Sequence, residues 1–448
     1  MKKKILLTIY FILLSLFAAW TWTLTAPNLV LSNASWYWQT QTYLWEHFYG
    51  DRPWVTYTYA LLIVCLFLVF LGIYFCFRHQ HQHFSLAQIK NIKNIKKNLN
   101  FSKLPFFSPQ LKSFALTIFL LCIPLLFSFN ALSFDVFNYL FNAKMVAVYQ
   151  ANPHVKTALD FSFDPWTRFM HNVHTTAPYG YGWTAVSLLP YYLGFGKLLP
   201  TWLMFRLFNL CLLLASLAVV VQLQLRRHHH LNLAQLWLFF GNPLVLIELI
   251  GNIHNDLWMM LPMLVSILLL LPEEKRQLSW SRLLGSCLLY AFSLSIKYAT
   301  LALAPLWLYL LVSNYRSRFR PLLQKCSLKM QLLVARLLTF VNHYFFDFAA
   351  LLMFLPLLTS RSQRFHPWYL TWSLIFLPLC KSKIIRLLAL VLSLSSLCRY
   401  LPYLWENGYA DNTVFIQQLI SLLPAAVVSA AWLFYFVGSW LRQRCKFS

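Results

Sequence analysis

Charged residues are scarce in this sequence. Asp, Glu, Lys and Arg make up 11% of its 448 residues, whereas apolar residues make up 59%. An ordinary soluble domain carries about 25% charged residues, so the composition excludes a water-soluble fold. Glycine is also scarce, with 11 residues, and the chain has neither a collagen repeat nor a heptad repeat, which excludes those fibrous classes. What the sequence has instead is a series of apolar runs long enough to cross a bilayer.

Cysteines are few and show no pairing pattern. The nine cysteines are scattered, mostly inside apolar runs, and form no C-x-x-C. We therefore expect them to be small buried side chains rather than a disulfide framework or a metal site. No cofactor and no structural metal is indicated by the sequence.

Acidic residues are scarce as well, since 12 Asp and Glu oppose 37 Lys and Arg and the net charge is +25. Such an excess can indicate a nucleic-acid partner. Here, however, the bases gather in short segments between apolar runs, above all in segment 78–113, which holds seven of them. This distribution follows the positive-inside rule for membrane proteins. We therefore expect membrane lipid as a partner, no nucleic acid, and a cytoplasmic location for the basic loop 78–113.

The apolar runs predict an all-α fold, a polytopic transmembrane helical bundle of about 11 spans that forms one multi-pass domain over residues 1–448 in the plasma (inner) membrane. Run 283–313 holds 31 residues, about 46 Å as one helix, which exceeds a bilayer core of about 30 Å. Because both flanks are basic, we predict two short helices that turn near Lys297 and Tyr298, with one long tilted span as the alternative. The other expected spans are 5–24, 56–77, 114–132, 201–225, 231–250, 256–272, 331–359, 367–380, 384–401 and 414–438.

A long outer loop, 133–200, follows the third span. Its first part, 133–182, is the longest and least apolar outer segment, and such segments are usually functional. Residues 183–199 are apolar, yet a crossing there would place Arg226 and Arg227 outside, against the positive-inside rule. We therefore predict that 183–199 lies along the outer interface as a short helix that ends at Pro200.

The acids are unevenly distributed over this topology. Two of the twelve, Glu273 and Glu274, face the cytoplasm, and Glu248 and Asp347 lie within spans. Membrane insertion determines the side of Asp and Glu residues less strictly than that of Lys and Arg. The excess of acids on the outer side therefore needs another cause. We predict a polar chamber at the outer face. The acids on the outer side are Glu46, Asp51, Asp135, Asp160, Asp164, Asp256, Glu406 and Asp411.

Asp135 is the sharpest catalytic candidate. It directly follows the third span, and Asp135, Asn138 and Asn142 recur at the spacing of one helical face. A carboxylate there could act as a general base that takes a proton from an acceptor hydroxyl. The alternative is an N-terminal helix cap.

A second polar cluster is the hexapeptide Gly251–Asp256, which contains His254, Asn255 and Asp256 between two spans. A turn requires only Gly and Asn there, and the acid Glu248 stands in the preceding span, where acids are functional candidates. A divalent cation is an alternative ligand, although the spacing matches no specific metal template.

A third cluster, 361–369, contains Arg361, Arg364, His366 and Tyr369 at an outer span boundary. A guanidinium group matches phosphate oxygens, so these arginines are candidates for holding an anionic lipid or diphosphate. The alternative is snorkelling with an aromatic belt. Further phosphate candidates, in decreasing order, are Lys297 and then Arg206 with Arg399.

These motifs, taken in order, resemble the GT-C superfamily of integral-membrane glycosyltransferases, and within it the polyprenol-phosphate-mannose-dependent mannosyltransferases of bacterial envelope polysaccharide synthesis. Two departures are Tyr181, where the family has Pro, and a single acid at 135, where many relatives have two. The motifs are Asp135-x-x-x-Tyr139, Asn152-Pro153, Pro178-Tyr179-Gly180-Tyr181-Gly182-Trp183, Asn242-Pro243, Gly251-x-x-His254-Asn255-Asp256, Ile296-Lys297-Tyr298 with Pro305, and His366-Pro367-Trp368-Tyr369.

The resemblance implies transfer of a hexose, mannose in the first place, from a polyprenyl-phosphate sugar to a glycan or lipid-linked acceptor on the outer face. Asp135 would be the base, and Arg361, Arg364 and Lys297 would hold the phosphate. The resemblance implies no metal. It makes the following residues candidates for binding the substrates: Tyr139, Tyr179, His254, Asn255, Asp256, His366 and Tyr369.

Two other classes of protein remain open from the sequence. A transporter or flippase of an anionic lipid or polysaccharide would use the same charges as a pathway, but it should show inverted repeats, which we do not find. In a structural membrane protein the outer acids would be incidental.

Overall fold

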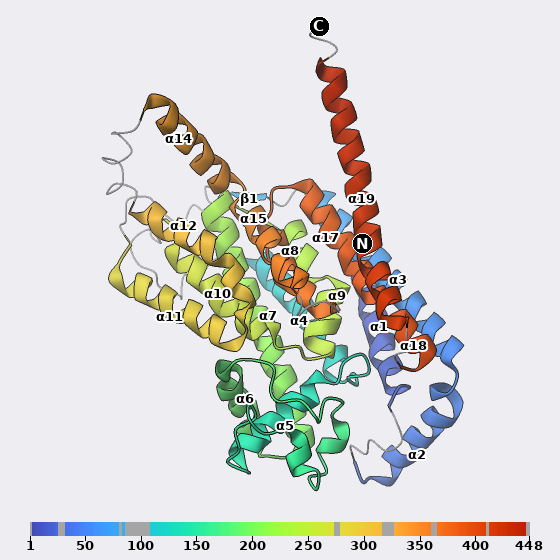
Figure 1. Cartoon of the computed structure of the whole chain (residues 1–448). Coiled ribbons are helices and arrows are strands. Elements are labelled where there is room, and N and C mark those ends of the chain that lie inside the picture. Colours follow the sequence, from blue (N-terminus) through green and yellow to red (C-terminus); the bar gives the residue numbers. More distant parts are fainter. Residues whose placement is uncertain are drawn as a thin grey trace.

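The computed structural model describes residues 2–25, 32–79, 83–85, 108–272, 278–315, 327–359, 365–408 and 412–444. It is 79% helical, with almost no strands, which confirms the predicted all-α membrane bundle (Figure 1). One short antiparallel pair joins β1 (His83–Ser85) to β2 (His230–Asn232). Most of the basic loop 78–113 lies outside the described residues.

The N-terminal helices form one wall of the bundle. The long helix α3 and helix α4 both pack against α1, and Ser108 caps α4 by accepting a hydrogen bond from the N–H of Leu111. An aromatic-rich helix, α2, and a π-helical turn, η1, connect α1 to α3 on one end of the bundle. The bounds are α1 (Lys2–Trp22), α2 (Ser35–Leu44), η1 (Trp45–Tyr49), α3 (Arg52–His79) and α4 (Pro109–Leu126).

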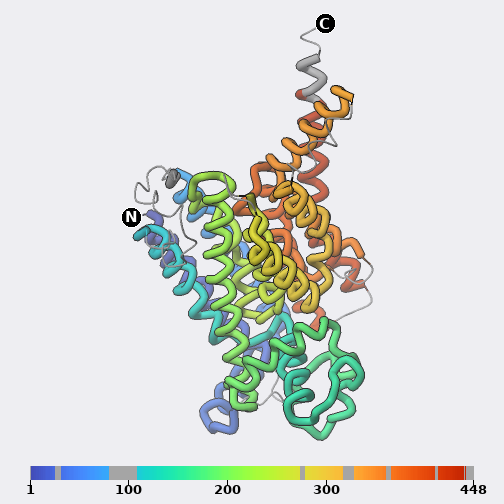
Figure 2. Tube along the Cα trace, turned by 90° about the vertical axis from the view of Figure 1, so that its left-hand side faces the viewer, coloured from blue at the N-terminus to red at the C-terminus, as the bar shows by residue number. Residues whose placement is uncertain are grey.

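The outer loop predicted by the sequence folds as a lobe at one end of the bundle, away from the C-terminus (Figure 2). A salt bridge of 2.5 Å between Lys144 Nζ and Asp164 Oδ2 ties its first helix to its central turns. The elements are α5 (Asp135–Ala147), η5 (Ala158–Phe161), η6 (Thr167–Phe169) and α6 (Tyr181–Leu193).

Helix α6 is the separate short helix expected before the next span, but its end differs from the prediction. It ends at Leu193, and the next helix, α7 (Leu198–His228), already begins before Pro200. The break lies at Phe195 and Gly196, which adopt left-handed φ angles of 55° and 62°. Pro200 is tolerated because it stands in the first turn of α7, where its missing N–H has no helical partner.

The centre of the bundle is built from α7 and the segments that follow it. Helix α8 and the following segment α9–η7 meet at an angle of 48°. The bend lies at Asn242, whose side chain accepts a hydrogen bond from the N–H of Leu244 and so caps the new helix that begins with Pro243. Helix α10 packs on α11 and α7. The bounds are α8 (Leu233–Phe240), α9 (Pro243–Leu246), η7 (Ile247–Gly251), α10 (Asp256–Leu270) and α11 (Trp280–Ile296).

The predicted turn near Lys297 is present. Helix α11 ends at Ile296, Lys297 is extended, and the chain continues as η8 (Tyr298–Leu303) and α12 (Ala304–Asn314). The C-terminal part is more broken than expected: segment 367–380 forms three short buried turns instead of one helix. Pro378, which has no N–H to donate, separates the last turn from the one before it. Its elements are α14 (Leu328–His343), α15 (Phe345–Leu352), η9 (Leu355–Leu358), η11 (Pro367–Leu370), α16 (Thr371–Leu374), η12 (Leu377–Leu379), α17 (Lys383–Cys398), α18 (Tyr400–Glu406) and α19 (Thr413–Arg444).

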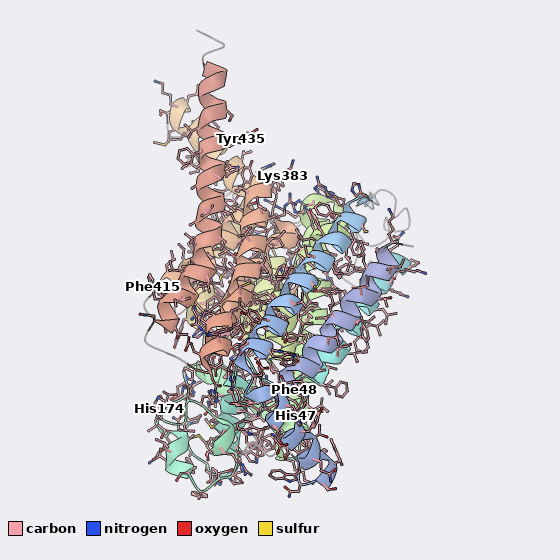
Figure 3. All side chains as sticks on the ribbon, turned by 90° about the vertical axis from the view of Figure 1, so that its right-hand side faces the viewer. His47, Phe48, His174, Lys383, Phe415 and Tyr435 are labelled. Atoms are coloured by element: carbon pink, nitrogen blue, oxygen red, sulfur yellow. The ribbon has the colours of Figure 1, made fainter. Side chains whose placement is uncertain are left out.

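Six helices in the described part of the chain are long and apolar enough to cross a membrane, or up to eight if each bent pair counts as one span. Shorter apolar helices such as α10 must therefore contribute if about 11 crossings occur. The two ends of the bundle contain different parts of the chain. Figure 3 shows His47 and His174 at the end with the outer lobe, and Lys383 and Tyr435 toward the opposite end.

Candidate functional site

A cavity of about 1080 Å³ lies where the outer lobe meets the bundle. Polar residues of the lobe form one part of its wall and aromatic residues of η11 and α16 another. The turn after α11 adds Lys297 and apolar side chains, η9 adds further apolar side chains, and the segment from the end of α17 into α18 adds Arg399 and two tyrosines. The residues used below that line it are Asp135, His171, Tyr179, Lys297, Leu301, Ala302, Leu355, Pro356, His366, Trp368, Tyr369, Trp372, Arg399 and Tyr400.

Asp135 is the first residue of α5, and its carboxylate faces this cavity. The residue before it, Phe134, makes no side-chain cap, and the Oδ2 atom of Asp135 accepts a hydrogen bond of 3.4 Å from the hydroxyl of Tyr179. With 22% of its side chain exposed, Asp135 is reachable from the cavity. Asp135 therefore contacts Tyr179 at the cavity wall.

Tyr179 and Tyr139 extend this polar corner. Their hydroxyl groups are 3.2 Å apart. Burial, followed by the charge of Asp135, raises the pKa of Tyr179 well above its ordinary value, so its hydroxyl stays protonated and donates. The loop that carries Tyr179 is anchored by Gly180, whose N–H donates to the carbonyl of Ile296 at 3.0 Å. Because Ile296 precedes Lys297, this bond also fixes the adjoining part of the wall that contains Lys297.

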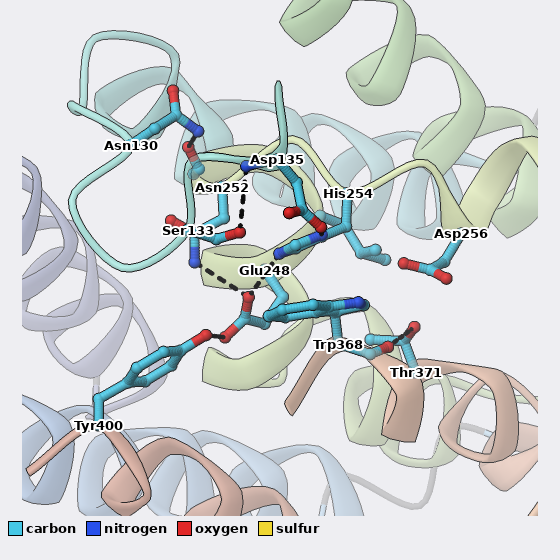
Figure 4. A network of polar contacts seen from close by, with 12 residues as sticks. Asn130, Ser133, Asp135, Glu248, Asn252, His254, Asp256, Trp368, Thr371 and Tyr400 are labelled. Carbon is cyan, nitrogen blue, oxygen red and sulfur yellow. Dashed lines mark hydrogen bonds and ion pairs between the residues drawn. The ribbon is translucent and has the colours of Figure 1, made fainter. Parts of the chain in front are cut away.

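His254 lies directly behind Asp135, between two carboxylates (Figure 4). Its Nδ1 atom is 3.7 Å from Oδ2 of Asp135, and its Nε2 atom is 3.3 Å from Oε2 of Glu248. The ring is fully buried and stacks on Trp368, with centroids 3.8 Å apart. Trp368 in turn stacks on His366 at 4.4 Å. A row of three rings therefore leads from the buried His254 to the cavity wall.

Asp256 is buried behind the cavity wall and binds the cation Lys297. Its Oδ1 atom is 2.6 Å from Nζ of Lys297 and accepts a hydrogen bond of 2.5 Å from Nε1 of Trp372. The ammonium group also lies over the ring of Tyr179, 4.7 Å from its centroid. Asp256 is 1% exposed, whereas Lys297 reaches the cavity. The acid therefore holds the cation in place from behind the wall.

The sequence-predicted residues thus fall into two layers. Asp135, Tyr179, Lys297, His366 and Tyr369 line the cavity. Tyr139, His254, Asn255 and Asp256 are buried behind them. Within the described part of the chain, neither polar side-chain atom of Asn255 forms a hydrogen bond, and the ring nitrogens of His254 have close carboxylates but no bond of hydrogen-bond geometry. Arg361 and Arg364 lie outside the described residues.

The two weaker arginine candidates, Arg206 and Arg399, have different surroundings in the structure. Arg206 is fully buried, and its guanidinium donates to the backbone carbonyls of Leu125, Ser128 and Gly251. It is a structural brace and not a phosphate ligand. Arg399, by contrast, lines the cavity at the end of α17. Charge alone could not separate them, because both lie near the outer end of an apolar span.

Three further residues enter the site without a clear signal in the sequence. Tyr400 donates a hydrogen bond of 3.0 Å to Oε1 of Glu248, and Trp372 binds Asp256. His171 lines the cavity and stacks on Phe134 at 3.9 Å. Burial lowers the pKa of His171, although Asp135 opposes the shift, so its ring is neutral near pH 7. In a sequence with 18% aromatic residues, a single aromatic residue or His belongs to no motif, so the sequence does not mark these three as site residues.

Within the residues that the structure describes, no group of three or more His, Cys, Asp and Glu side chains is arranged to hold a metal ion. The charged partners around the cavity are instead paired with one another, as in Asp256 with Lys297. The arrangement can position a hydroxyl near a carboxylate and an anion near a cation.

Comparison with known proteins adds a family match. Residues 29–313, more than half of the chain, match the family model described as alpha-(1->6)-mannopyranosyltransferase, N-terminal domain. No curated protein and no solved structure matches the chain. The matched region contains Asp135, the hexapeptide Gly251–Asp256 and Lys297, but not the cavity residues that follow residue 313.

Proposed function

Because the chain belongs to the alpha-(1->6)-mannopyranosyltransferase family and is a membrane mannosyltransferase, we propose that it takes mannose from a polyprenyl-phosphate sugar. The acceptor would be a hydroxyl of a glycan or of a lipid-linked glycan. We place the reaction on the outer face of the plasma membrane.

The observation that carries this proposal is that one cavity contains a reachable carboxylate, Asp135, and a cation held in place, Lys297. Transfer of a sugar from a phosphate needs a base for the acceptor hydroxyl and positive charge for the departing phosphate. Asp135 takes the acceptor proton while the new bond forms between the acceptor oxygen and the anomeric carbon. The bond between that carbon and the phosphate oxygen breaks, and the phosphate leaves as an anion.

The cations of the cavity wall suit that leaving group. Lys297 presents its ammonium group with its position fixed by Asp256, and Arg399 lines the same cavity. Arg361 and Arg364 stay candidates for the same role from the sequence. Cations already oriented where charge develops stabilise the transition state without reorganisation.

The apolar part of the wall suits a lipid-linked donor. Leu301, Ala302, Leu355 and Pro356 line the cavity. Leu301 is 57% exposed and Leu355 is 52% exposed, so this part of the wall continues onto the outer surface of the helical bundle. A polyprenyl chain could stay in the bilayer there while its phosphate enters the polar cavity. A nucleotide sugar would make no use of these residues.

The assignment to the outer face rests on charge. The end of the bundle opposite the lobe carries Arg226, Arg227 and Lys383, as the positive-inside rule expects of a cytoplasmic end. The cavity lies at the other end, beside the lobe of α5 and α6.

A direct test uses purified protein, radiolabelled polyprenyl-phosphate mannose and an α-1,6-linked mannose oligosaccharide, with GDP-mannose as the control donor. We expect transfer from the lipid donor only and its loss in Asp135→Asn with the fold intact. Consumption of GDP-mannose, or full activity of Asp135→Asn, would overturn the proposal. Movement of the lipid across liposomes without consumption of donor would favour a transporter.

A further inference from the structure

The site contains a buried acid, Glu248, for which the proposed reaction has no use. Its side chain is fully buried in the π-helical turn η7. Oε1 accepts a hydrogen bond of 3.0 Å from the Tyr400 hydroxyl, and Oε2 accepts one of 2.9 Å from Nδ2 of Asn252. A buried carboxylate is tolerated only with such partners. The remaining neighbour of Oε2 is Nε2 of His254, at 3.3 Å.

His254 connects this acid to Asp135. Its two ring nitrogens point at the two carboxylates, with Nδ1 3.7 Å from Oδ2 of Asp135 (Figure 4). The stack on Trp368, at an interplanar angle of 15°, prevents the ring from turning. The imidazole therefore has a fixed orientation relative to both acids.

The backbone next to His254 adopts a strained conformation. Ile253, directly before His254, has a left-handed φ of 62°, a conformation that β-branched residues rarely adopt and that costs on the order of 1–3 kcal/mol. The N–H of His254 donates to the carbonyl of Glu248 at 3.1 Å, and Nδ2 of Asn209 donates to the carbonyl of His254 at 2.9 Å. Such conformations cluster at functional sites, where the surroundings maintain them.

We infer that Glu248 is a positioning residue that acts through His254 on Asp135. Together with the stack on Trp368, its carboxylate holds the imidazole in the orientation in which Nδ1 faces Oδ2 of Asp135. The Tyr179 hydroxyl contacts the same Oδ2 atom, so Oδ1 is the oxygen that the acceptor hydroxyl meets. The inference rests on the proposed role of Asp135 as the base.

This inference assigns His254 a different part from the substrate-binding role that the sequence suggested. Neither His254 nor Glu248 lines the cavity; both are fully buried behind it. A substrate therefore meets Asp135, and the two residues behind it control only how that carboxylate is presented. Residues of this kind affect kcat and leave substrate binding unchanged.

The test is Glu248→Gln, which keeps the size of the side chain and places an amide where a carboxylate faced His254. The amide removes the negative charge beside Nε2, so the interaction that holds the imidazole in its orientation toward Asp135 weakens. We expect kcat to fall about 10- to 100-fold, as for the loss of an interaction with a charged group, with KM for polyprenyl-phosphate mannose within twofold of wild type. Binding of polyprenyl phosphate, measured by microscale thermophoresis in detergent, should not change.

Asp347→Asn is the matched control. Asp347 is another buried acid, 3% exposed, but it accepts hydrogen bonds from the N–H groups of Lys381 and Ser382, away from the cavity. Its loss should lower stability and leave kcat per folded molecule unchanged. An equal fall of kcat in both variants would show that Glu248 contributes only structure and would overturn the inference.

If Glu248→Gln does not fold, His254→Gln replaces it, with the same expected fall of kcat at constant KM. A rise of KM for the donor, with kcat unchanged, would return His254 to substrate binding and overturn the inference. An active Asp135→Asn would instead overturn the proposed function. An inactive Asp135→Asn together with a fully active Glu248→Gln would overturn the inference alone.

Discussion

Lys297 and Asp256 form an ion pair of 2.6 Å at a cavity wall, with the carboxylate 1% and the ammonium side chain 7% exposed. The two residues lie at the same end of a packed helix pair, since Asp256 begins α10 and Lys297 follows the end of α11. Lys297 could therefore serve a substrate anion, while Asp256 neutralises it when the cavity is empty.

A first prediction concerns this pair. Asp256→Asn leaves a buried ammonium group without its partner and should lower the free energy of unfolding by about 3 kcal/mol. The double variant Asp256→Asn/Lys297→Met should regain most of that stability but not the transfer activity, because the cation is lost. Thermal unfolding in detergent and mannose transfer are the two measurements. A double variant that regained transfer would show that the pair is only structural.

A second prediction concerns the contact between the outer lobe and the cavity. A Cβ atom on Gly180 would lie 2.0 Å from the carbonyl oxygen of Ser295, so Gly180→Ala must displace the loop of Tyr179 or the chain before Lys297. We expect a loss of about 1–3 kcal/mol and reduced transfer. Gly50→Ala is the control, since nothing lies within 4 Å of its added Cβ. Equal stability of the two variants would refute the contact.

A third prediction concerns the hydroxyl of Tyr179. Tyr179→Phe removes the hydrogen bond to Asp135 and the contact with Tyr139. The bond to the Asp135 carboxylate is long, at 3.4 Å, so its loss should cost about 1 kcal/mol. We therefore expect kcat to fall about fivefold, with only a small change of the melting temperature. Tyr192→Phe, on an exposed side chain of α6, should leave both unchanged. An unaltered kcat in Tyr179→Phe would remove this residue from the site.

A fourth prediction concerns pH and the outer lobe. Burial by itself would raise the pKa of Asp164, but hydrogen bonds from Lys144, the N–H of Trp166 and Tyr149 outweigh it and lower the pKa below its ordinary 3.8. A carboxyl with a lowered folded-state pKa adds stability that is complete above the ordinary value and is lost as pH falls through the folded value. The lobe of wild type should therefore lose stability below about pH 4.

Asp164→Asn tests this directly. At pH 7 the variant should be less stable by about 2 kcal/mol, and its stability should vary less between pH 4 and pH 2 than that of wild type. Hydrogen exchange of the lobe at several pH values measures both. Asp160→Asn should have a smaller effect, because Asp160 is exposed and its main contact, the N–H of Thr157, can also be accepted by an amide oxygen. Parallel pH curves for wild type and Asp164→Asn would contradict the assignment.

Much of the fold follows from local features of the sequence. Apolar length predicts helices that suit a bilayer, and the excess length of 283–313 predicts the turn at Lys297. Charge at the end of α7 predicts that α6 is separate. The breaks in segment 367–380 were missed, because its prolines lie in an apolar run that otherwise reads as a span. The position of Asp135 beside a cavity followed from its place after a span.

By itself, the sequence determined the all-α membrane class, the family and the motifs that contain Asp135, His254, Asp256 and Lys297, because these depend on composition and on spacing along one segment. Only the tertiary structure decided which side chains reach the cavity. It placed His254 behind Asp135, turned Arg206 into a brace and brought Tyr400 to Glu248, 152 positions apart in the chain. The physical reason is that helix crossing and rotation, set by packing between distant segments, determine which face of each helix meets the cavity.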